Sequence, residues 1–519
     1  MTVHDLAIVG SGLAGSLLAL IGRRLGRSVL LLEKSAHPRF VIGESSTPLS
    51  NLLLEEIAAR WDQPWLASFS KWGPWRREHP DVAVGLKRGF TFYRHPWDRP
   101  FEGLSDRSDQ LLVAASPRDE VADTHWYRPE LDHALVRKAE EAGVRYVDRV
   151  TLTAAEELPD RMVLSGTHDG APCRFEARLV LDATGPRGFL HRALSLPEVP
   201  FRRHAPTQTL FSHFRGVRRL ETMEPFDRFP SPPFPPDDAA VHHVFPGGWI
   251  WVLRFGNGIT SAGVTCVDPL AGSLGLAEGA AAWERVLSHL PTVGEQFSEA
   301  EAVAPFFHVP RLPFRTGASA GDRWALLPYA AAFVDPLLSA GFPLTLLGIV
   351  RLAEAIETEW ESPRLPGLLR AHAAQTLREV DAAEGLVAAL YSAFEDFPLF
   401  SRLSLLYFAA ASFSETARRL RRAERARGFL LCDEPAFATE LEAIGEAARS
   451  LPPSGPLREA RRAEVMDRVL RAIEPWDVAG LGRTDRHGWY PVEADDLRAA
   501  RARLGAGAEE IQELLARCW

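Results

Sequence analysis

Apolar residues follow two different periods in the first part of the chain. Residues 6–9 form a short apolar run, residues 13–25 repeat apolar positions with the period of a helix, and residues 28–32 form a second apolar run. Short continuous apolar runs are typical of strands buried in a parallel sheet. The order strand, helix, strand therefore predicts a Rossmann-like domain at the start of the chain.

The pattern changes twice further along. Strand-like runs separated by proline-rich turns fill roughly residues 187–315 and predict an antiparallel sheet. Helical patterns then cover residues 344–361, 366–394, 403–427, 434–450, 460–473 and 494–518. We therefore expect an α/β protein with three parts. These are a discontinuous Rossmann-like domain (1–186 and 316–356, with a substrate-lining insertion at 61–122), an antiparallel-sheet substrate domain (187–315) and a helical C-terminal region (357–519).

Composition excludes several classes of function. The 519 residues carry 59 basic against 68 acidic side chains, and a net charge of −9 gives no electrostatic footprint for nucleic acid. Cys173, Cys266, Cys432 and Cys518 are far apart, which argues against a disulfide framework or a metal site. No basic, apolar leader opens the sequence, and the apolar run at 325–350 is interrupted by Asp335 and three prolines. We expect a soluble cytoplasmic protein without a membrane span.

A glycine-rich turn joins the first predicted strand to the first predicted helix. It reads Gly-x-Gly-x-x-Gly, in which the glycines make the turn, let the backbone approach a pyrophosphate and let the helix pack on the strand. An acidic residue ends the second strand, where it can bind a ribose diol. The pattern predicts a dinucleotide site but does not separate FAD from NAD. The predicted site residues are Gly10, Gly12, Leu13, Ala14, Gly15, Glu33 and Lys34.

Further segments place polar and aromatic residues at fixed spacings. They are Arg39 with Gly43-Glu44-Ser45; Lys87 with Phe90 and Phe92 in an alternating strand-like stretch, 85–92; Arg128 at the start of a helical pattern; Asp182-Ala183-Thr-Gly185 after an apolar run; Trp249-Ile-Trp251; and Phe333-x-x-Pro336-x-x-Ser339-Ala340-Gly341. Each has a structural alternative: a helix cap, a solvated lysine, a surface ion pair, or aromatic residues packed in a sheet.

The segments, in this order, resemble the flavin-dependent halogenases, a branch of the FAD-dependent monooxygenases, over roughly residues 1–356. The resemblance implies that FAD is bound by the glycine-rich turn together with Arg39, Gly43, Glu44, Ser45, Arg128, Asp182, Ala183 and Gly185. It implies a halide site at Ser339, Ala340 and Gly341 and a catalytic lysine, Lys87. It also implies that Trp249, Trp251, Phe333 and Pro336 separate the substrate from the flavin.

The resemblance implies a reaction as well. A separate flavin reductase supplies FADH2, which with O2 and chloride or bromide yields HOX, and HOX passes by way of Lys87 to an electron-rich ring. Tryptophan halogenases have a glutamate where this chain has Leu338, so a phenol, resorcinol or pyrrole is favoured over free tryptophan. The ring can arrive free or on a carrier protein, and the residues do not decide between the two.

Two departures from the family pattern leave alternatives open. Leu253-Arg254 stands where the halogenases have Ile-Pro, and Pro328-Tyr329 stands where many flavin hydroxylases bind the ribityl chain. These departures motivate an FAD-dependent monooxygenase or oxidase without halide chemistry as the alternative enzyme, and a flavin-binding sensor as the non-enzymatic one. Lys71 competes with Lys87 for the catalytic role, although the apolar spacing after it does not fit.

Overall fold

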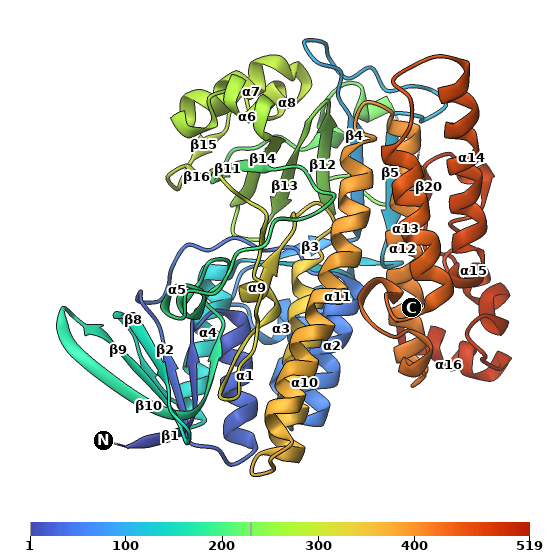
Figure 1. Cartoon of the computed structure of the whole chain (residues 1–519). Coiled ribbons are helices and arrows are strands. Elements are labelled where there is room, and N and C mark those ends of the chain that lie inside the picture. The colour runs from blue at the N-terminus through green and yellow to red at the C-terminus, as the bar shows by residue number, and fades with distance from the viewer. Residues whose placement is uncertain (1, 229–230, 519) are drawn as a thin grey trace.

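A seven-stranded sheet forms the nucleotide-binding side of the molecule in the computed structural model, which describes residues 2–228 and 231–518. Strands β2, β1, β10 and β18 run parallel at its centre, as the apolar runs predict, and β8 and β9 extend it as an antiparallel hairpin (Figure 1). Its strands are β7 (Arg145–Val147), β2 (Val29–Leu32), β1 (Val3–Val9), β10 (Ala171–Asp182), β9 (Met162–His168), β8 (Val150–Glu157) and β18 (Trp324–Leu326).

Helices α1 (Leu13–Arg24), α4 (Arg128–Glu141) and α10 (Gly341–Glu359) pack beside this sheet, with α2 (Pro48–Arg60) against α10. The short helices α3 (Trp72–Glu78), α5 (Phe189–Ala193) and α9 (Pro328–Ala331) fill the connections. Because the starts of α1 and α10 both line one hollow, the fold brings two helix starts, far apart in sequence, to the same site.

A nine-stranded sheet forms the second layer, and most of its neighbours are antiparallel, as expected. Its strands come from three parts of the chain, so it extends beyond the expected 187–315. They are β15 (Glu301–Ala302), β11 (Thr207–Arg215), β14 (Thr260–Val267), β13 (Gly248–Arg254), β12 (Ala240–Phe245), β4 (Gly89–Arg94), β5 (Gln110–Ala114), β20 (Trp489–Tyr490) and β16 (Phe307–Val309). Helices α6 (Asp268–Ser273), α7 (Ala280–His289) and α8 (Pro291–Gln296) lie at its far end (Figure 1).

The single strand expected over residues 85–92 is wrong. The chain breaks at Arg88, whose N–H donates to the Asp238 carbonyl, so that β3 (Val84–Lys87) pairs with β6 (Asp123–Trp126) while β4 enters the second sheet. A second small pair joins β17 (Phe314–Arg315) to β19 (Ala332–Phe333). The break places Lys87 at the junction between the two layers.

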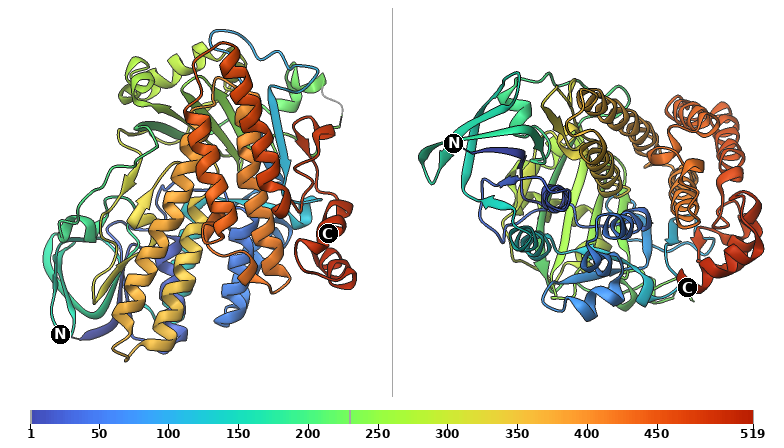
Figure 2. Two further views of the ribbon diagram at one scale, coloured as in Figure 1. Left: turned by 45° about the vertical axis from the view of Figure 1, so that its right-hand side comes forward. Right: turned by 90° about the horizontal axis from the view of Figure 1, so that it is seen from below.

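The C-terminal region is helical, as predicted, and stands as a layer along one side of both sheets (Figures 1 and 2). One apolar core runs from α1 and α2 through α10 into this layer, which packs as part of the same body. Its helices are α11 (Leu365–Tyr391), α12 (Phe397–Arg419), α13 (Pro435–Arg449), α14 (Pro456–Ile473), α15 (Ala494–Ala499) and α16 (Ala508–Cys518). The single helix expected over 494–518 is wrong because Gly505, at φ +65°, interrupts it. Among the described helices, none is both long and apolar enough to cross a membrane.

Candidate active site

A cavity of about 500 Å³ lies between the two sheets and collects most of the predicted cofactor residues. The glycine-rich turn, the segment 39–45, the end of β10, the strand β13 and the start of α10 all contribute to its lining. The predicted residues that line it are Gly12, Leu13, Ala14, Arg39, Gly43, Glu44, Ser45, Arg128, Ala183, Gly185, Trp249, Trp251, Phe333, Pro336, Ser339 and Gly341.

The glycine-rich turn has the tight geometry that its sequence predicts. Gly10 has a φ of +99°, and a Cβ there would lie 2.7 Å from the Ala183 carbonyl oxygen. A Cβ on Gly15 would lie 1.9 Å from the Gly10 carbonyl oxygen, so α1 could not pack where it does. These two glycines therefore shape the turn rather than line the cavity, while Gly12, just before the helix start, faces it.

Two arginines face this helix start. A Cβ on Gly12 would lie 3.3 Å from an Nη of Arg39 and 3.4 Å from an Nη of Arg128. Arg128 is buried and paired with Asp132 at 2.8 Å, and it donates to the Gly43 carbonyl, so the surface ion pair considered as its alternative does not form. Buried Arg39 Nε has no partner in the described part of the chain. Guanidinium groups beside a helix N-terminus suit a diphosphate, so these residues fit FAD.

The acidic residues predicted to bind the cofactor, Glu33 and Asp182, mainly accept hydrogen bonds from backbone N–H groups. Glu33 accepts hydrogen bonds from the N–H groups of Ser11 and Ser35. Burial opposes its ionisation, but Arg39 and these bonds outweigh burial and hold the pKa of Glu33 below its usual value. The Asp182 carboxylate accepts from the backbone N–H groups of residues 184 and 190 and so orders the turn that presents Ala183. Lys34 is exposed and does not line the cavity.

Glu44 joins the two layers of the molecule. Its side chain lies 2.8 Å from His213 Nε2 on β11, and its carbonyl accepts from the Trp126 N–H. Both members of the Glu44–His213 pair are almost completely buried. The Glu44 carboxylate is therefore bonded to His213 instead of being free for a cofactor. His213 was not predicted, because nothing in its pattern distinguishes it from other histidines on strands.

The predicted halide segment leads into α10. Ser339 adopts a left-handed conformation, at φ +52°, and its N–H donates to the Pro336 carbonyl at 3.0 Å, so this N–H is not available to a halide. Ala340 is the N-cap residue of α10 and packs against the core, while Gly341 lines the cavity. Of the three residues of the predicted halide segment, Ala340 and Gly341 thus keep N–H groups that can bind an anion at this helix start.

The two tryptophans of β13 form one wall of the cavity. Trp249 is fully buried, and the Trp249 and Trp251 ring centroids lie 5.8 Å apart. Trp249 Nε1 donates to the Tyr391 hydroxyl, which donates to Asp335 at 2.8 Å. Burial raises the pKa of Asp335 to about 7. Tyr391 belongs to α11, and sequence reasoning did not connect that helix with the site.

Arg254, one of the two departures from the family pattern, has a structural role. It lies at the end of β13, pairs with the buried carboxylate of Asp237 at 2.7 Å and donates to the Val217 carbonyl. The other departure, Tyr329, lines the cavity beside Gly185.

Lys87 is completely buried between this cavity and a second one. Its Nζ donates to Ser45 Oγ at 2.8 Å and to the Ser46 carbonyl, and it lies 3.9 Å from the centroid of the Phe90 ring. Burial lowers the pKa of Lys87 to about 7, and Asp123, its cross-strand neighbour, opposes that shift. Ser45 lines the first cavity and Phe90 lines the second, so the amine stands in the wall that divides them.

The second cavity has a volume of about 820 Å³. Phe90, Tyr407 and Phe408 contribute aromatic rings to its lining, and Lys71 contributes an amine. The C-terminal segments 478–497 and 514–518 close it on the other side. The insertion at 61–122 therefore lines a cavity, but the C-terminal region supplies more of the wall.

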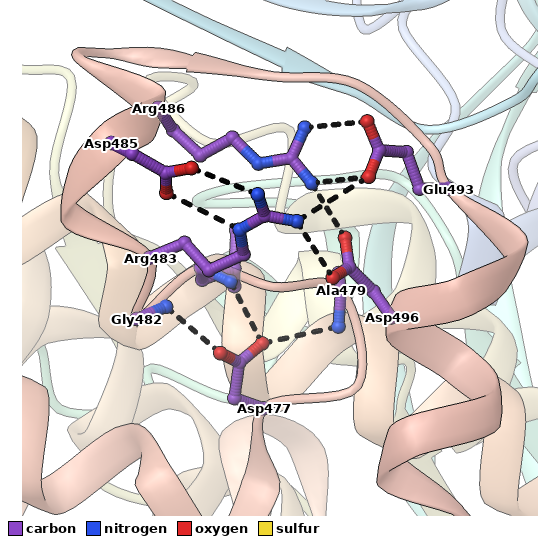
Figure 3. A network of polar contacts seen from close by, with 9 residues as sticks. Asp477, Ala479, Gly482, Arg483, Asp485, Arg486, Glu493 and Asp496 are labelled. Atoms are coloured by element: carbon purple, nitrogen blue, oxygen red, sulfur yellow. Dashed lines mark hydrogen bonds and ion pairs between the residues drawn. The ribbon is translucent and has the colours of Figure 1, made fainter.

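A polar network orders the C-terminal part of that wall (Figure 3). The Asp477 carboxylate accepts from the N–H groups of Ala479 and Gly482, and Arg486 pairs with Glu493 and Asp496 at 2.7 and 2.8 Å. Because Arg486 is nearly buried, these bonds hold the loop around β20 in place beside the cavity.

Comparison with known proteins finds relatives that are named halogenases. No protein-family model matches the chain. The chain is 29% identical to the monodechloroaminopyrrolnitrin halogenase PrnC of Pseudomonas fluorescens, over 78% of this chain and 70% of that protein. It is 26% identical to the tetracycline 7-halogenase of Kitasatospora aureofaciens, over 99% of this chain and 95% of that protein. The crystal structure of halogenase PltM in complex with phloroglucinol and FAD shares the fold, with a TM-score of 0.82 at 24% identity, covering 93% of this chain and 99% of that one.

Proposed function

The chain belongs to the flavin-dependent halogenases, and we propose that it halogenates an electron-rich aromatic ring, of phenol, resorcinol or pyrrole type, with FADH2, O2 and a halide. One observation carries the proposal: a buried amine stands in the wall between a cavity that suits FAD and a second, aromatic-lined cavity. Reduced FAD and O2, when bound, supply the oxidising equivalent that converts halide to HOX.

The residues of the first cavity bind the flavin diphosphate and the halide and exclude the substrate ring. The glycine-rich turn, Arg39 and Arg128 hold the diphosphate. The N–H groups of Ala340 and Gly341 hold the halide at the start of α10, where the helix dipole favours an anion. Trp249 and Trp251 fill the wall of this cavity and keep the substrate ring out of it. A separate reductase supplies the reduced flavin.

Lys87 carries HOX from one cavity to the other. Its ammonium already donates to Ser45 and Ser46, and the remaining N–H donates to the HOX oxygen. A ring carbon in the second cavity forms the C–X bond as the O–X bond breaks, and the departing hydroxide takes a proton from Lys87 to become water. The ring then loses the proton from the substituted carbon, and Lys87 is reprotonated.

A substrate-free experiment tests the halide step. The enzyme with bound FADH2 is mixed with oxygenated buffer at increasing bromide or chloride, and flavin absorbance is followed during reoxidation. A saturable halide dependence, absent after removal of the Gly341 site by Gly341→Pro, supports the proposal. Reoxidation that ignores halide would favour the monooxygenase or oxidase reading.

A further inference from the structure

The lysines of this chain are unevenly placed. The sequence has four of them, at positions 34, 71, 87 and 138, among 59 basic residues. Lys34 is exposed and Lys138 pairs with Glu141, whereas Lys71 lines the second cavity and Lys87 lies behind the Phe90 ring that lines it. Lys87 has a place in the proposed mechanism, but Lys71 does not.

Lys71 has no acidic partner of its own on the cavity side. In the described ranges it forms no ion pair, while the acids that line the cavity are already paired with arginines. These pairs are Glu55 and Glu415 with Arg419, Glu56 with Arg418, Glu120 with Arg77, and Glu493 with Arg486. An anion that enters the cavity can therefore pair with the Lys71 ammonium, which forms no ion pair with a lining carboxylate.

The carboxylate behind the wall is shared. Asp123 is buried, attracts both Lys71 and Lys87, and has Oδ1 occupied by the Asn51 amide at 2.7 Å. Glu55 and Glu415 are both paired with Arg419 at the same end of the cavity. Lys71 therefore has no ion pair of its own in the described part of the chain, and a singly charged anion in the cavity would supply one.

The neighbours of Lys71 define what kind of anion fits. Phe90, Tyr407 and Phe408 line the same cavity and provide apolar, aromatic surface, and Phe90 also contacts the Lys87 amine. A ring packed there with a charged oxygen at Lys71 would lie beside the residue that delivers HOX. An ionised hydroxyl donates more electron density to its ring than a neutral one does.

We infer that Lys71 anchors the substrate in the second cavity by binding the ionised oxygen of an acidic phenol. The inference rests on the proposed function, because it states in which form the aromatic substrate binds. Lys71 is then a specificity-determining residue that selects phenols ionised near neutral pH over neutral rings of the same shape.

Several other titratable groups surround Lys71. Asp123 faces it from β6, Lys87 lies beyond on β3, and Cys518 faces it from α16. Glu55 and Glu415, on α2 and α12, lie at the same end of the cavity. A measurement that reports the ionisation of the ligand itself separates Lys71 from these groups.

The probe is 4-nitrophenol, whose absorption moves to longer wavelength when it ionises. It is titrated against pH with the FAD-loaded protein, and difference spectra are taken against the same protein without the phenol. We expect the bound phenol to ionise about one pH unit below the free phenol, as an opposite charge nearby predicts. Lys71→Met should abolish that shift, Lys71→Arg should keep it, and Lys138→Met should leave it unchanged.

Each outcome decides the inference. If the bound phenol has the same pKa as the free phenol in the wild type, the inference is overturned, whether or not Lys71→Met folds. It is also overturned if Lys71→Met lowers the pKa of the bound phenol as much as the wild type does. 4-Nitroanisole, which cannot ionise, should bind wild type and Lys71→Met equally. If the phenol titration shows no shift but flavin reoxidation depends saturably on halide, only the anchoring role of Lys71 is overturned. If the titration shows the shift but reoxidation ignores halide, the halogenase proposal is overturned and the phenolate site stands.

Discussion

The Lys87 ammonium donates a hydrogen bond to Ser45 Oγ across 2.8 Å, and this bond ties the catalytic candidate to the lining of the FAD cavity. The same ammonium contacts the Phe90 ring, which lines the other cavity. A change at Lys87 therefore separates delivery of the halogen from binding of the cofactor.

Replacement of Lys87 by Met should lower halogenation by about 10³-fold, the usual scale for loss of a positioned proton donor. Binding of FAD should persist, because Lys87 itself does not line the first cavity. Product formation and flavin fluorescence quenching measure the two effects separately. Lys138→Met serves as the matched control. A Lys87→Met enzyme with full halogenating activity would contradict the mechanism.

Asp123→Asn should make the halogenation rate fall at a lower pH on the alkaline side, or limb, of its pH profile. Burial lowers the pKa of Lys87 to about 7 while Asp123 opposes that shift, so the pKa falls further when the carboxylate is removed. The mechanism uses the ammonium form, which is lost as the pH rises through the pKa. We expect the limb to shift by about one unit. Rates at saturating halide across pH 5–9 measure it, and an unmoved limb would show that Asp123 does not act on Lys87.

The double variant Lys87→Met with Asp123→Asn should be inactive but about 1–3 kcal/mol more stable than the wild type, since buried charges are costly to desolvate. In the wild type the folded pKa of Lys87, about 7, lies below the unfolded value of 10.5. Between those values the unfolded chain binds the extra proton, so the wild-type free energy of unfolding should rise with pH, and the double variant should lose this rise. Urea unfolding at several pH values tests both statements.

His213→Ala should destabilise the protein by about 3 kcal/mol, because it leaves the buried Glu44 carboxylate without its partner. Glu44→Gln should cost less, since its amide oxygen can still accept a hydrogen bond. Chemical unfolding compares the two. Equal losses would mean that packing, and not the polar contact between the layers, determines the effect.

The sequence predicted well those features that are encoded locally. The glycine-rich turn, the parallel strands and most of the C-terminal helices follow from spacing and periodicity over short stretches. The break at Arg88 could not be predicted, because Lys87 and Phe90 obey one alternating pattern while their strands join different sheets. His213 and Tyr391 were missed for a related reason: His213 contacts Glu44 and Tyr391 accepts a hydrogen bond from Trp249, and both partners are more than 140 residues away.

The position of β20 has a consequence for biosynthesis. Its two residues, Trp489 and Tyr490, complete the edge of the second sheet beside β5, more than 370 residues earlier in the chain, and the same segment closes the second cavity. The first cavity takes its lining from residues up to 345. The residues that line the first cavity are therefore all synthesised before the last third of the chain, whereas the second cavity has no closing wall until that third has been synthesised and folded back.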